Sequence, residues 1–164
     1  MISFWAFAVF VRPLLEYCSS VWNPSYYCDV DKIESVQRRF TKNIGTLSSL
    51  TYPERLDVLH AESLELRRLK CDLTMMFRRP IIHGYCALDR SSFFTLHNSC
   101  TRDNKFKLRR QFSRVNCRLF SFTNRCIDAW NSLSDDVVCA PSVQVFKCRL
   151  VRFLLSNGGF INKF

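Results

Sequence analysis

The sequence predicts a mainly α-helical fold with an irregular or small β-containing segment in its middle. Apolar residues recur every three or four positions in both halves of the chain, which is the spacing of one face of an α-helix. Between residues 81 and 118 this periodicity fades. An apolar fraction of 48% with four glycines and five prolines is typical of a globular chain, and 164 residues suffice for one compact domain or two very small ones.

The first clear helix is predicted over residues 29–44. Its apolar stripe consists of Val30, Ile33, Val36, Phe40 and Ile44. Asp31 and Glu34 are spaced as a capping pair, and Gly45 is suited to end the helix. The basic side chains lie mostly off the stripe and give the helix a basic outer face: Lys32, Arg38, Arg39 and Lys42.

Two further helices are predicted before residue 80. Thr51 can cap the first, Pro53 is tolerated in its first turn, and Glu54 can reach back to the cap. Its inner face would hold Leu56 and Leu59. The second helix starts near Ser63 and ends before Pro80. Its inward residues are predicted to be Leu66, Leu69, Leu73 and Met76, and its outward ones Arg67, Arg68 and Lys70.

Two helices are predicted after residue 118. The first has the stripe Phe122, Cys126, Ile127, Trp130 and Leu133. The second has the stripe Val143, Phe146, Leu150, Phe153 and Leu154. Ser142 is suited to cap the second helix. Between these two helices, Asp135–Asp136 looks like the Asp-Asp pair of a polymerase. Because it follows a predicted helix, it is interpreted as a solvated turn.

The N-terminal run is predicted to be part of the core. Ten of its first eleven residues are apolar, but Arg12 and Pro13 end the run well short of the ~20 residues that a membrane span needs. No membrane association is expected. Trp22-Asn23-Pro24 is predicted to form a turn with the indole packed inward.

The charge favours polyanionic partners, because 24 Lys and Arg face 14 Asp and Glu and give a net charge of +10. Ordinary solubility is the alternative explanation. The nine cysteines form no C-x-x-C pair, so we expect reduced thiols in a nuclear or cytoplasmic protein, with no metal and no cofactor. His97 and Cys100, even with Cys86, are too sparse for the usual zinc signatures.

The most electropositive stretch is residues 102–118. It holds seven basic residues and one acid, Asp103, with Phe106 and Phe112 interleaved. Lys and Arg can neutralise phosphates, and exposed Phe can stack on unpaired bases. The alternative is a solvated loop whose Phe side chains enter the core.

Several strings together resemble the region after the polymerase palm in reverse transcriptases of CR1/jockey-like non-LTR (LINE-type) retrotransposons. They are VRPLLEYCSSVWNP (11–24), KIESVQRRFTKNI (32–44), LTYPERLDVLHAESLELRRLKCDL (50–73), SSFFTL (91–96), FTNRCIDAWNSLSDDVV (122–138) and APSVQVFKCRLVRFL (140–154). The resemblance covers residues 9 to 155. It implies a helical, thumb-like region over 1–80, an irregular basic connection over 81–118 and a C-terminal helical segment over 119–164.

The resemblance also implies that polymerase catalysis lies elsewhere. In that family, palm aspartates hold two metal ions, and this sequence has no aromatic-x-Asp-Asp motif. We therefore expect a truncated fragment that is not an enzyme. Its expected partners are RNA or an RNA–DNA hybrid, and the palm and fingers of the parent reverse transcriptase. A co-opted or decayed helical protein-interaction module is the alternative.

This chain departs from the family pattern at two places. Phe77-Arg78-Arg79-Pro80 would break a helix that runs on in the family, and Ser134 stands where a proline follows Trp-Asn-x-Leu. Within this frame, phosphate contacts are predicted for basic side chains on helix faces and in the central stretch. They are Arg38, Arg39, Lys42, Arg67, Arg68, Lys105, Lys107, Arg109, Arg110 and Arg114.

Overall fold

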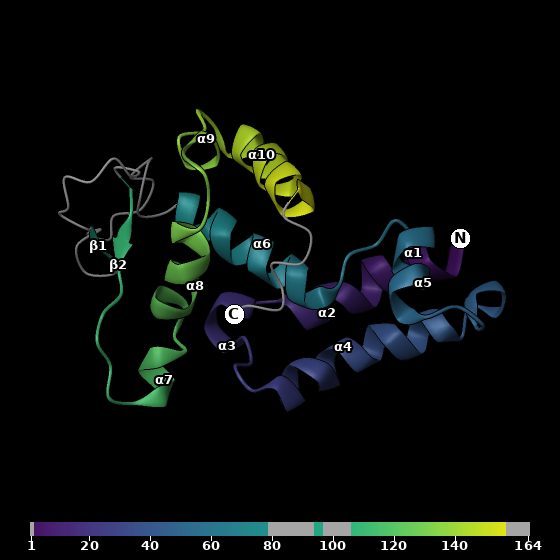
Figure 1. Cartoon of the computed structure of the whole chain (residues 1–164). Helices are drawn as coiled ribbons and strands as arrows, with labels where there is room; N and C mark the ends of the chain where they lie inside the picture. Colours follow the sequence, from purple (N-terminus) through teal and green to yellow (C-terminus); the bar gives the residue numbers. More distant parts are fainter. Residues whose placement is uncertain (1, 79–93, 97–105, 157–164) are drawn as a thin grey trace. The chain divides into compact units, whose positions relative to one another are not determined.

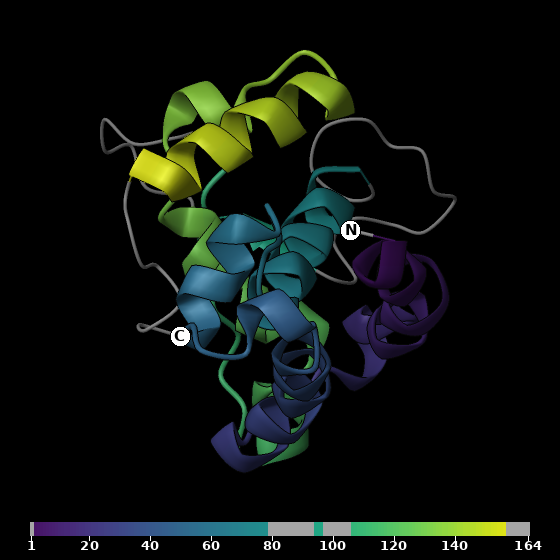
Figure 2. The ribbon, with the colours of Figure 1, turned by 90° about the vertical axis from the view of Figure 1, so that its right-hand side faces the viewer.

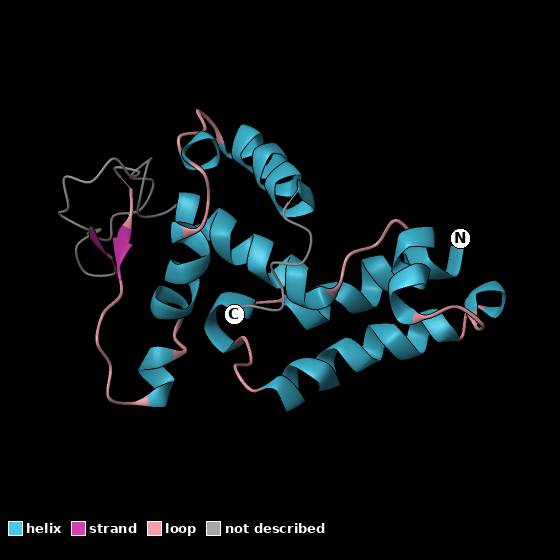
Figure 3. Ribbon diagram, in the orientation of Figure 1, coloured by secondary structure: helices cyan, strands magenta, loops and turns pink. Residues whose placement is uncertain are grey.

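The computed structural model confirms a mainly helical protein (Figure 1, Figure 3). It describes residues 2–78, 94–96 and 106–156. Before residue 79 the elements are α1 Ile2–Ala6, the π-helical η1 Phe7–Val11, α2 Arg12–Glu16, α3 Ser19–Trp22, α4 Tyr27–Lys42, the 3-10 helix η2 Gly45–Leu47, α5 Tyr52–Val58 and α6 Leu64–Met76. After it come β1 Thr95–Leu96, β2 Leu108–Arg109, α7 Asn116–Leu119, α8 Phe122–Asn131, α9 Asp135–Val138 and α10 Val143–Ser156.

The residues form two compact units, Met1–Arg68 and Leu69–Phe164. The boundary falls inside α6, whereas the sequence suggested divisions at 80 and 118. None of the helices in the described ranges is long and apolar enough to cross a membrane.

In the first unit, α4 differs from its prediction. It begins at Tyr27, and its C-cap is Asn43 rather than Gly45, which starts η2. The fully buried side chains of α4 are polar, namely Glu34, Gln37 and Thr41, while Val36 of the expected stripe is exposed. The apolar periodicity located the helix but did not identify its most buried face, because the side chains on that face are polar and form hydrogen bonds.

The start of α5 is confirmed. Thr51 and Glu54 form a capping box, with the Thr51 backbone N–H donating to the Glu54 carboxylate at 2.7 Å, and proline lies in the first turn. Hydrogen bonding to Thr51 lowers the pKa of Glu54. The most buried side chain of α5 is Arg55, while Leu56 and Leu59 are half-buried.

The N-terminal segment is less buried than predicted. The helix α1 continues through η1 into α2, and Phe7 is buried against the Phe40 ring at 4.5 Å between centroids. Phe10 and Leu14 remain 68% and 76% exposed. The prediction of a core element is therefore wrong for the outer side of this segment. It is also wrong for Trp22, which is 40% exposed because its indole N–H donates to the Tyr17 carbonyl near the surface.

The second unit has an aromatic core that the sequence predicted. The Trp130 and Phe146 rings stack with centroids 6.1 Å apart, and Phe146 stacks on Phe77 at 4.3 Å. The stripes of α8 and α10 are buried or half-buried as expected, and the Ser142 hydroxyl accepts the Val145 N–H at the start of α10. Helix α9 leads into α10, and the two pack together (Figure 2).

Candidate nucleic-acid interface

The basic central stretch is anchored to α8 through its backbone. Strand β2 pairs antiparallel with β1, with Leu108 opposite Leu96. Asn131 fixes Leu108 from the side: its amide oxygen accepts the Leu108 N–H at 2.9 Å, and its amide nitrogen donates to the Leu108 carbonyl at 2.8 Å. The Leu108 side chain is buried. One side chain of α8 therefore sets the register of this strand.

Two further contacts with α8 anchor the residues on both sides of Leu108. The Trp130 indole N–H donates to the Phe106 carbonyl at 3.1 Å, and the Arg110 guanidinium pairs with Asp128 at 2.9 Å. Three side chains from one helix thus hold residues 106 to 110. Arg110 loses part of its value as a phosphate ligand, because a carboxylate already neutralises it.

Beyond Arg110 the chain leaves α8 and runs to α7 as an extended loop (Figure 3). Several of its side chains face solvent, since Phe112 is 87% exposed and Val115 60%, while Gln111 and Ser113 are half-buried. Arg109, Arg114 and Arg118 are exposed as well. From residue 106 to residue 118 there are five basic residues and no acid, so this loop carries positive charge with an aromatic ring among the cations.

The far end of the loop is also fixed. The Arg118 guanidinium donates to the Gln111 side-chain oxygen at 3.3 Å, and the buried Asn124 amide donates to the Arg118 carbonyl at 2.7 Å. The Val115 carbonyl accepts the Leu119 N–H at 3.0 Å. Tethering at both ends reduces the conformational entropy that the loop loses when it binds a ligand.

The basic face of α4 forms a separate candidate surface in the first unit. Arg38 pairs with Asp31 at 2.7 Å and lies over the Tyr52 ring at 5.4 Å, and the Asp31 carboxylate raises the pKa of Arg38. Arg39 and Lys42 are exposed, and no ion pair engages them within residues 2–78. The accessible cations of α4 therefore lie in its last turn.

Two predicted residues on α6 are structural. Arg67 pairs with Glu16, with its second nitrogen donating at 3.0 Å. Arg68 was predicted to face outward but is 1% exposed, because it lies one helical turn from the buried Leu64 and shares its face. Arg68 is therefore removed from the candidate site.

The remaining predicted ligands fall in two groups. Lys107 is half-buried, Arg109 ends β2, Arg110 follows it, and Arg114 lies in the loop just described. Lys105 lies outside the described residues, as do His97, Cys100 and Cys86. The sequence did not single out Asn131 and Trp130 as anchors of the basic stretch, because hydrogen bonds to a distant backbone leave no local pattern.

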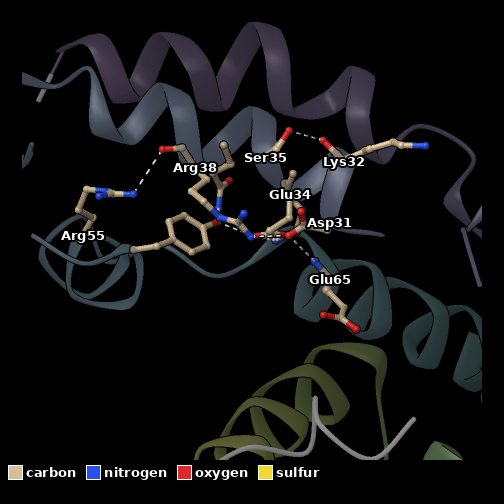
Figure 4. A network of polar contacts seen from close by, with 10 residues as sticks. Asp31, Lys32, Glu34, Ser35, Arg38, Arg55 and Glu65 are labelled. Carbon is tan, nitrogen blue, oxygen red and sulfur yellow. Dashed lines mark hydrogen bonds and ion pairs between the residues drawn. The ribbon is translucent and has the colours of Figure 1, made fainter. Parts of the chain in front are cut away.

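The buried polar cluster on α4 resembles a reaction centre in composition but serves as a helix cap (Figure 4). The Glu34 carboxylate accepts the Leu64 N–H at 3.0 Å, the Glu65 N–H at 3.3 Å and the Tyr52 hydroxyl. Burial and the Glu34 carboxylate raise the pKa of Tyr52. With its oxygens engaged by three donors, Glu34 has little capacity left to act as a general base.

Gln37 and Thr41 complete this cluster. The Gln37 amide donates to the Tyr52 hydroxyl at 3.1 Å and to the Glu62 carbonyl at 3.0 Å. The Arg55 guanidinium donates to the Thr41 hydroxyl at 3.2 Å. These contacts tie α4 to α5 and to the start of α6, so the cluster stabilises the first unit.

Acidic and sulfur ligands do not gather in the described ranges. No group of three His, Cys, Asp or Glu side chains suited to a metal lies among residues 2–78, 94–96 and 106–156. Asp135 and Asp136 were interpreted as a solvated turn; they are exposed as predicted, but they form the first turn of the short helix α9, and Asp136 pairs with Arg149 at 3.0 Å. Burial raises the pKa of the Cys126 thiol, which keeps it protonated.

Comparisons with known proteins add no relative. No protein family, curated protein or solved structure matches this chain.

Proposed function

We propose that this chain binds nucleic acid through the phosphate backbone, without reading base sequence, as the thumb and post-thumb region of a non-LTR retrotransposon reverse transcriptase. The ligand is RNA or an RNA–DNA hybrid, and nucleotide addition requires palm and fingers domains. We place this activity in the nucleus or cytoplasm. The chain by itself is a binding fragment rather than a polymerase.

The observation that carries the proposal is the exposed basic stretch that runs from the end of β2 through the loop to α7. Arg109 and Arg114 are exposed, they carry no ion pair within residues 106–156, and the stretch around them contains no acid. Such cations retain their attraction for phosphate and release condensed counterions on binding. Arg110 contributes less, because Asp128 neutralises it. The exposed end of α4, with Arg39 and Lys42, supplies a second group of contacts.

The test is a salt titration of binding. Fluorescence anisotropy with the full chain and an RNA–DNA hybrid should show affinity that falls linearly with salt on logarithmic axes. The variant R109Q/R114Q should bind more weakly and reduce the magnitude of the slope by about 2, because each phosphate contact contributes ~0.9.

A charge-matched control separates local contacts from net charge. Lys147 and Arg152 are exposed on α10, and K147Q/R152Q removes the same two charges. This control should keep the slope of the parent chain to within about 0.5. If R109Q/R114Q binds like the control, or if affinity is independent of salt, the proposal is refuted.

A second function is favoured by one observation in the first unit. Phe10, Leu14 and Trp5 expose large apolar surfaces along α1, η1 and α2. An exposed apolar patch is typical of a protein-binding surface, which agrees with the alternative of a helical interaction module. Association driven by this patch would be insensitive to salt and would be weakened by L14E, whereas R109Q/R114Q would leave it unchanged.

A further inference from the structure

We propose that Phe112 is a stacking platform for an unpaired base, so that the loop between β2 and α7 prefers a single strand to a duplex. This inference rests on the proposed function and identifies the ligand as a nucleic-acid strand with accessible bases. A phosphate-binding surface needs only cations. An aromatic ring held in water among them requires a different explanation.

The first step is the exposure of the ring. Phe112 is 87% exposed, whereas Phe77, Phe94 and Phe146 are buried in the same unit. Leaving a phenyl ring in water forgoes the favourable free energy of its burial. The alternative interpretation, in which the Phe side chains of this stretch enter the core, is therefore wrong for Phe112.

The second step is the reason for this exposure. Asn131, Trp130 and Asp128 hold residues 106 to 110 against α8, and Asn124 holds the Arg118 carbonyl at the other end. Between these fixed points Gln111 and Ser113 are half-buried, whereas Phe112 between them is exposed. The anchors thus present the ring at a restricted position, which lowers the entropic cost of stacking.

The third step is the charge around the ring. Arg109 and Arg114 flank Phe112 in sequence, and both are exposed. Successive phosphates of a strand bring bases with them, and every base has a face that can stack on an aromatic ring. A basic and aromatic surface of this kind fits a single strand, because the bases of a duplex already stack on each other. A partner protein would have to offer acidic groups beside an apolar contact for Phe112. Positive charge alone does not favour such a protein over a nucleic-acid strand.

The experiment separates base contacts from phosphate contacts. The full chain is titrated against an oligothymidine of about 12 nucleotides and against an abasic strand of equal length, which keeps the phosphates but has no bases. The parent chain should prefer the base-bearing strand about 5-fold or more, which is the effect of one stacked base. The variant F112A should bind both strands equally.

Three further variants sharpen the result. F112W should retain the preference because it keeps an aromatic face, and F112L should lose it because it keeps only apolar bulk. V115A alters a neighbouring exposed apolar side chain and should leave the preference intact. Circular dichroism of each variant checks that the fold is unchanged, as expected for an exposed site.

Each failure has a distinct meaning. If F112A keeps the preference for the base-bearing strand, or if it lowers the affinity for both strands by the same factor, Phe112 does not stack and the inference is overturned. If R109Q/R114Q binds both strands more weakly while the parent chain shows no preference between them, only the stacking inference is refuted. If R109Q/R114Q has no effect on either strand, the proposed function falls as well.

Discussion

Replacing Glu34 tests the interpretation of the buried cluster as a helix cap. Glu34 on α4 accepts the backbone N–H groups of Leu64 and Glu65, the first two residues of α6, and also the Tyr52 hydroxyl. Donors to a charged group contribute ~1.5–3 kcal/mol each, and the helix dipole adds a smaller term at this position. The contributions overlap, since all three donors share one carboxylate.

The variant E34A should therefore lower the free energy of unfolding by about 3–5 kcal/mol, as expected when a buried charged network loses one member. E34Q keeps one acceptor oxygen and loses the charge, so about 1–3 kcal/mol is expected. The control is D31A on the same helix, where an exposed ion pair with Arg38 is lost and the change should not exceed about 1 kcal/mol.

Urea unfolding of the full chain, followed by circular dichroism, measures these differences. Hydrogen exchange at the Leu64 and Glu65 amides measures the cap directly, because removing the acceptor exposes both N–H groups to solvent exchange. If E34A and D31A destabilise equally, or if both amides keep their protection in E34A, the cap contributes little and the reasoning is wrong.

The remaining predictions concern the second unit and the sorting of basic residues. N131A should cost about 1–3 kcal/mol and speed proteolysis between residues 106 and 116, because both hydrogen bonds to Leu108 are lost. R68A should lower the melting temperature while leaving the salt dependence of nucleic-acid binding unchanged, since Arg68 is buried. Burial raises the pKa of Cys126, so the stability linked to this thiol is present below its ordinary pKa and is lost as the pH rises above that value. Native Cys126 should also resist alkylation at pH values where exposed cysteines react. Primer extension by this chain alone with magnesium should give no product, because the sequence lacks the aromatic-x-Asp-Asp motif, and robust extension would refute the proposal that the chain is not itself a polymerase.

The sequence predicted helices well where burial is apolar. In α8 and α10 the inward residues are hydrophobic, so their periodicity marks both the helix and its inner face. The same reasoning found α4 but not its buried face. Gln37 is fully buried because its partners are Tyr52 and the Glu62 carbonyl, and no local pattern reveals partners that are distant in sequence.

The same limit applies to the basic residues. From the sequence, Arg67, Arg68 and Arg109 are all candidate phosphate ligands, since each is a cation in a basic neighbourhood. In the structure Glu16 neutralises Arg67, the fold buries Arg68, and Arg109 stays exposed. The acid that neutralises Arg67 comes from another element, α2, so the accessibility of such a cation to phosphate is a tertiary property.

The net charge of +10 therefore overstates the charge available to a ligand, and its distribution matters more than its size. Cations paired with Asp31, Glu16, Asp72 or Asp128 neutralise phosphates less effectively, because a carboxylate competes for them, and so displace fewer of the counterions condensed on a nucleic acid. The loop between β2 and α7 keeps exposed cations in a stretch of the chain without acids. A polyanion should bind first where the cations have no competing carboxylate, and that place also presents Phe112 to solvent. Phosphate attraction and base stacking are thus expected at one surface, and removing either should leave the other measurable.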